Sequence, residues 1–222
     1  MQESIKVVIL GASGNGLDIV DTLLDINQSV GYQKYECMGF LEDREHLQHK
    51  KVYLDYEVLG KITDITRFDD DIFFATAIGS SKTFLKKADI LSHIPLSRFV
   101  TLIHPTAYIS RTAKIGTGSV ILQNVTIANN VCIGNQVIIL ANTVINHDCV
   151  IGDYSCIASS VSISGGVKIG KNCYIGTNTA IRENVKVGKK CLIGMGSNVL
   201  QDIPDNHVVM GNPARIKGNS IR

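Results

Sequence analysis

The hydrophobic positions in the C-terminal half of the chain recur every six residues. From Ile109 to Val199, each sixth residue is Ile or Val, and no position in this series breaks the pattern. A second series lies two residues earlier, from Ala107 to Ser197, and holds only small or β-branched side chains. A period of six fits neither an α-helix nor strands joined by hairpin turns, so the pattern predicts a solenoid.

Each hexapeptide is expected to form one short strand and one corner. The aliphatic residue then points inward, the small residue fills the remaining interior, and Gly and Asn adopt the backbone angles of the corners. Three hexapeptides close a triangular coil, so residues 109–199 predict about five coils, stacked about 4.8 Å apart. A β-sandwich also has regular turns, but its strand spacing varies. We therefore expect an all-β domain over residues 101–222, a parallel β-helix capped by the chain after Gln201.

The first residues of the chain predict a strand, a glycine turn and a helix. The apolar run IKVVIL is followed by GASGNG and by the helical pattern LDIVDTLLDI. This order is typical of an α/β unit of the Rossmann type. We expect a small Rossmann-like domain over residues 1–100, with the segment IPLSRFVTLIHPTA as the junction to the β-helix.

The glycine turn favours a phosphate site over an NAD site. The dinucleotide fingerprint requires glycine at its third position, where Ser13 stands in this chain. The backbone amides of Ser13, Gly14 and Asn15 would lie at a helix N-terminus, which attracts anions. A tight turn with a purely structural role is the alternative.

Two acidic residues and a second strand end complete the expected nucleotide site. Glu42 and Asp43 follow the apolar strand ECMGFL, which places them at the carboxyl edge of the sheet, where such folds bind ligands. Carboxylates at this edge accept hydrogen bonds from a ribose or a base. Ile78 and Gly79 end another apolar strand, which would bring them beside the glycine turn.

Composition and charge narrow the partners. The chain of 222 residues is 45% hydrophobic, and its 22 basic and 20 acidic residues give a formal net charge of +2. The charges are dispersed, which argues against binding to nucleic acid. The apolar run near the N-terminus is too short for a secretion signal or a membrane span, so we expect a cytoplasmic protein.

The six cysteines form no C-x-x-C pair and no zinc-finger spacing, so reduced thiols are expected. Cys149, Cys173 and Cys191 belong to the small interior series and are expected in the core. Cys132 and Cys156 directly precede an inward Ile and are therefore expected to face outward.

His147 is the only histidine inside the repeat, since the others beyond residue 100 are His104 and His207. A zinc enzyme on such a fold needs several histidines, so we expect no metal site. His147 and Asp148 should lie at an exposed corner, where a nearby carboxylate would strengthen the imidazole as a base. A solvated surface histidine is the alternative. Because adjacent side chains on an extended segment point apart, their contact stays open.

The whole chain resembles the bacterial sugar acetyltransferases that join a small nucleotide-binding domain to a left-handed β-helix. The matching segments are GASGNGL, FLED, AIGSS, NHDCVIGDYS and VVMGNPARIKG. The resemblance implies that His147 is the general base, that Asp148 supports it, and that the glycine turn with Glu42 and Asp43 binds the nucleotide. Two positions depart from the family pattern, since Asn15 and Cys156 stand where its members often carry His.

The resemblance also implies a homotrimer with coenzyme A bound along the β-helix. The residues that it assigns to coenzyme A are Cys156, Thr177, Gly194, Met195, Gly211, Pro213 and Ala214.

The expected function is acetyl-CoA-dependent N-acetylation of a nucleotide-linked 4-amino-4,6-dideoxyhexose in surface glycan biosynthesis. The amine would attack the thioester directly while His147 takes its proton and a backbone N–H at a corner stabilises the oxyanion. O-acetylation of a sugar such as sialic acid and a non-catalytic assembly role are the alternatives. The sugar, its attachment to UDP or dTDP, and the acyl chain length stay open.

Overall fold

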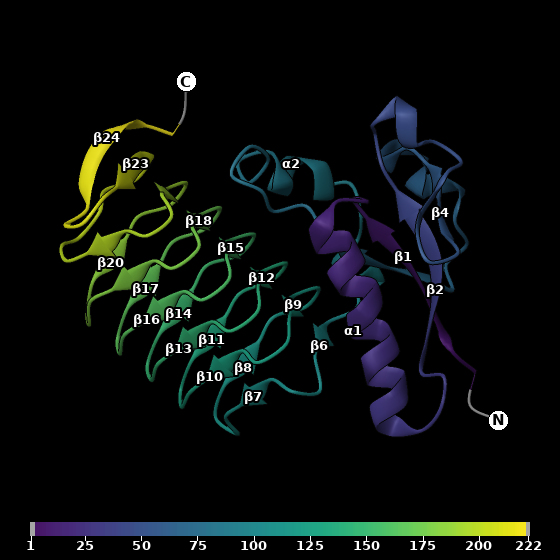
Figure 1. The fold of residues 1–222 in the computed structure, drawn as a ribbon, viewed down its shortest axis with the longest axis horizontal. Coiled ribbons are helices and arrows are strands. Elements are labelled where there is room, and N and C mark those ends of the chain that lie inside the picture. Colours follow the sequence, from purple (N-terminus) through teal and green to yellow (C-terminus); the bar gives the residue numbers. More distant parts are fainter. Residues whose placement is uncertain (1–2, 221–222) are drawn as a thin grey trace.

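The computed structural model describes residues 3–220, which form an N-terminal α/β domain and a C-terminal parallel β-helix (Figure 1). The N-terminal sheet has the strand order β3-β4-β2-β1-β5, and only the β3–β4 pair is antiparallel. Its elements are β1 (Ile5–Leu10), α1 (Gly14–Val30), β2 (Tyr35–Leu41), β3 (Lys51–Tyr53), β4 (Tyr56–Gly60), β5 (Ile72–Thr76) and α2 (Lys87–Leu91). Single 3-10 turns lie at Glu45–Leu47 and Leu96–Arg98, and a longer 3-10 segment at Ile62–Arg67.

The two faces of β1 pack into different cores. Val7 and Ile9 contact the buried side of α1, while Val8 and Leu10 lie in a second core with Leu91 of α2. Both faces of a parallel sheet are covered in this way, which explains the uninterrupted apolar run of β1. The predicted strand, turn and helix are observed, whereas the β3–β4 hairpin was not predicted.

Three sheets of two-residue strands form the β-helix (Figure 1). The first sheet, which also receives the C-terminal strands, contains β6 (Leu102–Ile103), β9 (Val120–Ile121), β12 (Ile138–Ile139), β15 (Cys156–Ile157), β18 (Tyr174–Ile175), β21 (Leu192–Ile193), β23 (His207–Met210) and β24 (Arg215–Asn219). The second contains β7 (Tyr108–Ile109), β10 (Thr126–Ile127), β13 (Val144–Ile145), β16 (Ser162–Ile163), β19 (Ala180–Ile181) and β22 (Asn198–Val199). The third contains β8 (Lys114–Ile115), β11 (Cys132–Ile133), β14 (Val150–Ile151), β17 (Lys168–Ile169) and β20 (Lys186–Val187).

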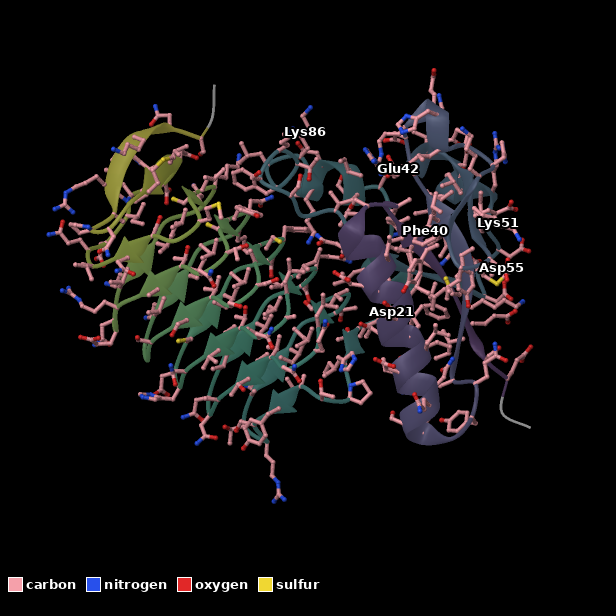
Figure 2. The ribbon with its side chains drawn as sticks, in the orientation of Figure 1. Asp21, Phe40, Glu42, Lys51, Asp55 and Lys86 are labelled. Carbon is pink, nitrogen blue, oxygen red and sulfur yellow. The ribbon has the colours of Figure 1, made fainter. Side chains whose placement is uncertain are left out.

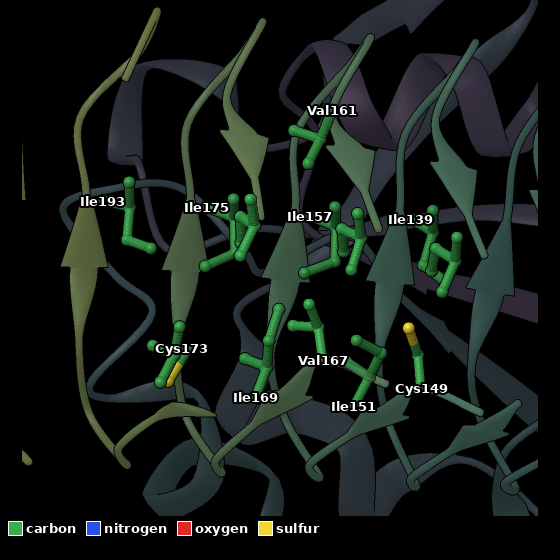
Figure 3. Close-up of a cluster of buried hydrophobic side chains, with 14 of the residues drawn as sticks. Ile139, Cys149, Ile151, Ile157, Val161, Val167, Ile169, Cys173, Ile175 and Ile193 are labelled. Atoms are coloured by element: carbon green, nitrogen blue, oxygen red, sulfur yellow. The ribbon is translucent and has the colours of Figure 1, made fainter. Parts of the chain in front are cut away.

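The six-residue period is translated directly into coils. Parallel pairing joins residues 18 positions apart, as in Ile157 with Ile175, so equivalent side chains stack in columns along the axis. Figure 3 shows the resulting interior, where Ile139, Ile157 and Ile175 repeat from coil to coil. From Gly118 to Gly196, one residue at each corner takes a left-handed backbone angle, most often Asn or Gly, and these residues include Gly118, Asn124, Asn130, Gln136, Asn142, Asp148, Gly166 and Asn184.

At both ends the β-helix extends beyond the strict six-residue series of residues 109–199. The coils begin at β6, inside the predicted junction, since Leu102 pairs with Val120. The last coil is shortened, because Ile193 pairs with Val209 and an isolated bridge joins Val187 to Ile203. The expected C-terminal cap is observed, and it consists of β23 and the antiparallel strand β24.

The N-terminal domain covers the first sheet of the β-helix. Val120 and Ile138 share a buried cluster with Val20 and Leu23 of α1, which lies between the two parts (Figure 1). His104 and Asp25 add a 2.8 Å contact between His104 Nε2 and the Asp25 carboxylate across this junction.

A buried lysine adds a polar contact to the same junction. Lys87 is fully buried, and its Nζ donates to the Gln136 carbonyl at 2.5 Å. Burial lowers the pKa of Lys87 to about 8. The second and third sheets of the β-helix are not covered by this junction.

Candidate active site

His147 and Asp148 form a close pair at the corner between the second and third sheets. The distance from His147 Nδ1 to Asp148 Oδ2 is 2.8 Å, and the two side chains are 66% and 58% exposed. Asp148 has a φ of 61°, so the chain is not extended here and the adjacent side chains turn toward each other. The contact that the sequence left open is therefore made.

The pair determines which ring nitrogen can act as a base. Because Nδ1 faces a carboxylate, Nδ1 carries the hydrogen of the neutral imidazole and donates a hydrogen bond to Asp148. Nε2 is left with a free lone pair. Hydrogen bonds from His147 and Asn130 hold the pKa of Asp148 below its ordinary value, so the carboxylate is ionised at neutral pH.

Gly165 lies one coil further along, directly against the His147 ring. A Cβ placed on Gly165 would stand 2.7 Å from His147 Nε2 and 2.6 Å from Cε1. The Gly165 carbonyl accepts a hydrogen bond from Asn184 N at 3.0 Å, whereas the Gly165 N–H donates to no acceptor within residues 3–220. The residue that packs against the His147 ring thus also carries a backbone N–H without an acceptor among the described residues, and a donor of this kind can stabilise an oxyanion.

Sequence reasoning missed Gly165, although a signal was present. The corner position that it occupies recurs every six residues, and every other residue there from Thr117 to Met195 carries a side chain. Its neighbour Gly166 has a φ of 72°, whereas Gly165 has no positive φ. The coil geometry therefore does not require glycine at residue 165.

The expected nucleotide residues gather in one cavity at the carboxyl edge of the N-terminal sheet. The cavity has a volume of about 380 Å³. Its lining includes Gly11, Ser13, Asn15, Glu42, Asp43, Arg44, Ile78 and Gly79. Of the residues expected here, Gly14 alone is not part of the lining, and it is the first residue of α1.

The N-terminus of α1 opens toward this cavity with free amide groups. Ser13 precedes the helix, but its side chain makes no capping bond, and the first turn holds no acidic residue. The N–H groups of Gly16 and Leu17 donate to the Ser13 carbonyl. Those of Gly14 and Asn15 find no acceptor in the described part of the chain, so they are available to an anion.

Glu42 and Asp43 differ in how much of each carboxylate is free. Glu42 Oε2 accepts from the Ala12 N–H at 3.0 Å and from the Arg44 guanidinium at 2.9 Å, and Oε1 accepts from the Arg44 N–H. Burial would raise the pKa of Glu42, but these hydrogen bonds outweigh it and lower the pKa. Glu42 therefore braces the glycine turn. Asp43 uses Oδ1 to accept from the Ile62 N–H at 3.0 Å, and Oδ2 has no partner among residues 3–220.

Most residues expected to contact coenzyme A lie at another corner, near the C-terminal end. Gly196 N donates to the Thr177 carbonyl at 2.8 Å, and Met195, which precedes Gly196, is 75% exposed. Asn198 links the tail to this corner, since its N–H donates to the Gly211 carbonyl at 3.0 Å and its carbonyl accepts from the Ala214 N–H. Gly194 packs against Met210 of β23, and Pro213 lies within the same tail.

Cys156 does not fit the role expected for it. Its side chain points out of the prism as predicted, but it is 0% exposed because the N-terminal domain covers it, with Gly79 directly above. Burial raises the pKa of its thiol to about 11. The expected contact between Cys156 and coenzyme A is therefore wrong, because Cys156 is a buried residue of the domain junction. A buried neutral thiol is also a poor nucleophile. Cys132 is exposed as expected.

The three remaining cysteines of the repeat are buried in the prism core, as expected from the small interior series: Cys149, Cys173 and Cys191.

The His147 corner and the nucleotide cavity do not meet within one chain. His147 lies between the second and third sheets, and the N-terminal domain covers the first. In a triangular coil this corner is opposite the covered side. A site that uses both features needs more than one chain.

Comparison with known families agrees with both parts of the fold. A profile described as the PglD N-terminal domain matches residues 6–90, and one described as bacterial transferase hexapeptide (six repeats) matches residues 130–165 and 166–201. The chain therefore carries a PglD-type N-terminal domain, followed by hexapeptide repeats of the bacterial transferase kind. The predicted family and the predicted order of an α/β domain and a parallel β-helix are thereby confirmed.

Solved structures of two acetyltransferases share this architecture over most of their length. The acetyltransferase domain of PglB from Neisseria gonorrhoeae FA1090, solved with acetyl coenzyme A, is 26% identical with a TM-score of 0.83, covering 96% of this chain and 100% of that domain. PerB from Caulobacter crescentus, solved with CoA and GDP-perosamine, is 24% identical with a TM-score of 0.78, covering 96% of this chain and 97% of that chain. The PerB likeness concerns the fold.

A curated relative matches over a shorter segment. The UDP-N-acetylbacillosamine N-acetyltransferase of Bacillus subtilis (strain 168) is 36% identical over 61 residues, which is 28% of this chain and 28% of that protein. None of the helices within residues 3–220 has the length and apolar character needed to cross a membrane.

Proposed function

We propose that this hexapeptide-repeat transferase moves an acetyl group from acetyl-CoA to the 4-amino group of a nucleotide-linked 4-amino-4,6-dideoxyhexose, a step in surface glycan biosynthesis. The observation that carries the proposal is the His147–Asp148 pair, whose free Nε2 lies against Gly165 and its unused N–H. The PglB domain solved with acetyl coenzyme A supports the donor. The name of the curated relative supports a nucleotide-linked sugar and N-acetylation.

The reaction proceeds by direct attack of the amine on the thioester carbonyl. As the new C–N bond forms, His147 Nε2 takes a proton from the amine, and the Asp148 carboxylate stabilises the resulting imidazolium. The Gly165 N–H donates to the developing oxyanion. Collapse of the tetrahedral intermediate breaks the C–S bond, and the proton returns from His147 to the leaving sulfur, which gives coenzyme A. No acyl-enzyme is required.

The cavity of the N-terminal domain holds the nucleotide. The free N–H groups of Gly14 and Asn15 bind its phosphates at the start of α1, and Ser13 adds a hydroxyl. Asp43 Oδ2 accepts a hydrogen bond from the base or the ribose. Glu42 contributes by fixing the turn, since both of its oxygens are already engaged.

The working enzyme is a homotrimer in this proposal. Because His147 lies opposite the sheet that carries its own N-terminal domain, it acts on a nucleotide sugar held by a neighbouring subunit. Coenzyme A lies between subunits, along the corner that presents Thr177 and Met195. Gly194, Gly211, Pro213 and Ala214 flank it from the last coil and the tail.

A thiol-release assay with acetyl-CoA tests the proposal against a panel of acceptors. The panel contains UDP-, dTDP- and GDP-linked 4-amino sugars, their 4-hydroxy counterparts, and free sialic acid. We expect release of coenzyme A with at least one nucleotide-linked amine and none with its hydroxyl counterpart. Activity on a free sugar alone would instead favour O-acetylation, and no release with any acceptor would refute acetyl transfer to these classes.

A matched pair of variants tests the nucleotide cavity. Asp43→Asn removes the charge at the free oxygen and is expected to raise KM for the nucleotide sugar about tenfold while leaving KM for acetyl-CoA unchanged. Asp55→Asn is the control, since Asp55 forms an exposed pair with Lys51 at the far edge of the sheet (Figure 2). Equal KM values in both variants would remove Asp43 from the site.

A further inference from the structure

Asn130 holds the carboxylate that faces His147. Its side-chain Nδ2 donates to Asp148 Oδ1 at 3.1 Å, while the other oxygen of the same carboxylate faces His147 Nδ1. Asn130 is itself fixed, because its backbone N–H donates to Thr112 Oγ1 at 2.9 Å. A chain of hydrogen bonds therefore runs across three successive coils and ends at the imidazole.

We propose that Asn130 is a positioning residue for His147, acting through Asp148. The inference rests on the proposed function, in which His147 is the base. Asp148 is more than half exposed, so with one partner its carboxylate could rotate into solvent. A second partner on the opposite oxygen keeps Oδ2 on the ring nitrogen and keeps the reactive nitrogen Nε2 in a fixed direction.

Among the charged groups around His147, Asp148 acts most strongly on the imidazole ring. The adjacent coils place the neutral residues Asn129 and Gly165 in the His147 column. The thiol of Cys149 donates to the carbonyls of His147 and Ser164 and packs inward.

The next charged groups in that column are more distant. Arg111 and Glu183 stand two coils away on either side, about 10 Å along the axis. A change in how Asp148 is held is therefore expected to alter directly the pH at which His147 takes up a proton.

The chain offers an internal control for a purely structural role. Asn124 Nδ2 donates to Asn142 Oδ1 at 3.3 Å, so the same kind of bond links two coils at a different corner. Asn124 and Asn142 have φ values of 57° and 61°, close to the 58° of Asn130. If such bonds only stabilise corners, loss of either bond should have the same effect.

Two substitutions at Asn130 are expected to act in opposite directions. Asn130→Gly keeps the left-handed backbone without strain and removes the donor. It should lower kcat about tenfold and move the acid limb of the kcat/KM profile to lower pH, by about half a unit, since the imidazolium loses its fixed partner. Asn130→Asp places a second carboxylate beside Asp148 and should move that limb to higher pH.

The experiment combines the pH profiles with an NMR titration of the His147 ring in wild type, Asn130→Gly, Asn130→Asp and Asn124→Gly. We expect opposite shifts for the two Asn130 variants, both in the rate profile and in the ring titration, and no shift for Asn124→Gly. Equal behaviour of Asn130→Gly and Asn124→Gly, or shifts of one sign in both Asn130 variants, would overturn the inference.

The ring titration also separates this inference from the proposed function. If no coenzyme A is released with any acceptor of the panel, but the titration of the His147 ring shifts as expected, the proposed function fails and the positioning role of Asn130 stands. If acetyl transfer is observed and the ring titration does not respond, the function stands and the positioning role fails. Thermal melting of each variant verifies that the coils are intact.

Discussion

Adding one methyl group at Gly165 is expected to displace the His147 ring without disturbing the coil. Ala141 already occupies an equivalent corner position in another coil, so the backbone there accepts alanine. The N–H of residue 165, the proposed oxyanion donor, is retained in Gly165→Ala. The substitution therefore changes the space beside the ring and little else.

The size of the effect follows from the contact distances. The new Cβ would stand 2.6 Å from His147 Cε1 and 2.7 Å from Nε2, whereas two carbon atoms in unstrained contact are at least about 3.5 Å apart. The ring must therefore move by about 1 Å. A displacement of this size lowers the rate by about 100-fold, or about 2.7 kcal/mol in the barrier. Folding stability is expected to stay equal or rise by about 0.4–1 kcal/mol, because alanine restricts the unfolded chain.

The assay is a comparison of kcat/KM for wild type, Gly165→Ala, His147→Ala and the double variant. If Gly165 acts through the ring, its substitution should cause no further loss once the ring is absent. Ala141→Gly serves as the control for a change of the same kind elsewhere. Two results would show that residue 165 does not act by displacing the His147 ring. One is an unchanged rate in Gly165→Ala, and the other is a full 100-fold loss when Gly165→Ala is added to His147→Ala.

Three other predictions concern Asp148, the buried Lys87 at the domain junction, and the prism core. Asp148→Asn keeps a residue that tolerates the left-handed corner but removes its charge, so kcat/KM should fall about tenfold at unchanged melting temperature; a normal rate would contradict the role of the charge. In the folded protein the pKa of Lys87 is lowered to about 8, so above that pH the unfolded chain binds more protons than the folded protein does. The free energy of unfolding of wild type, relative to that of Lys87→Met, should therefore rise by up to about 3 kcal/mol between pH 8 and 10.5. Urea unfolding at pH 7 and 10 measures this change, and a constant difference between the two proteins would contradict it. Ile175→Ala should cost about 2–5 kcal/mol in urea unfolding, since Ile175 is 0% exposed inside the prism, whereas the exposed Ser162→Ala should cost under about 0.5 kcal/mol; equal values would contradict the packing.

The repeat was predictable because each inward position obeys one local rule. Ile or Val every six residues fixes which face is buried, and pairing 18 residues apart then follows from three sides per coil. The rule fails at the end of the prism, where Ile203 and Val209 take inward places two residues early. A shortened coil leaves the period, so periodicity alone could not find it.

The contact between His147 and Asp148 was beyond the sequence for a different reason. It depends on one φ of 61°, which an extended strand would not have. Cys156 was only partly predictable for a similar reason. The repeat predicted that its side chain points out of the prism, but its burial depends on the N-terminal domain, which lies outside the repeat. Gly165, in contrast, was visible in the sequence as the one glycine in its register, and only the neighbouring ring explains it.

In the proposed reaction, His147 removes a proton from an amine during acetyl transfer. The most direct test of this step is the steady-state rate of His147→Ala with acetyl-CoA and the best acceptor of the panel, together with calorimetry of acetyl-CoA binding. We expect turnover to fall by about 10²–10⁴-fold, because a general base supplies that much, while the affinity for acetyl-CoA stays within about twofold. A variant that binds acetyl-CoA and turns over at a near-normal rate would contradict the account.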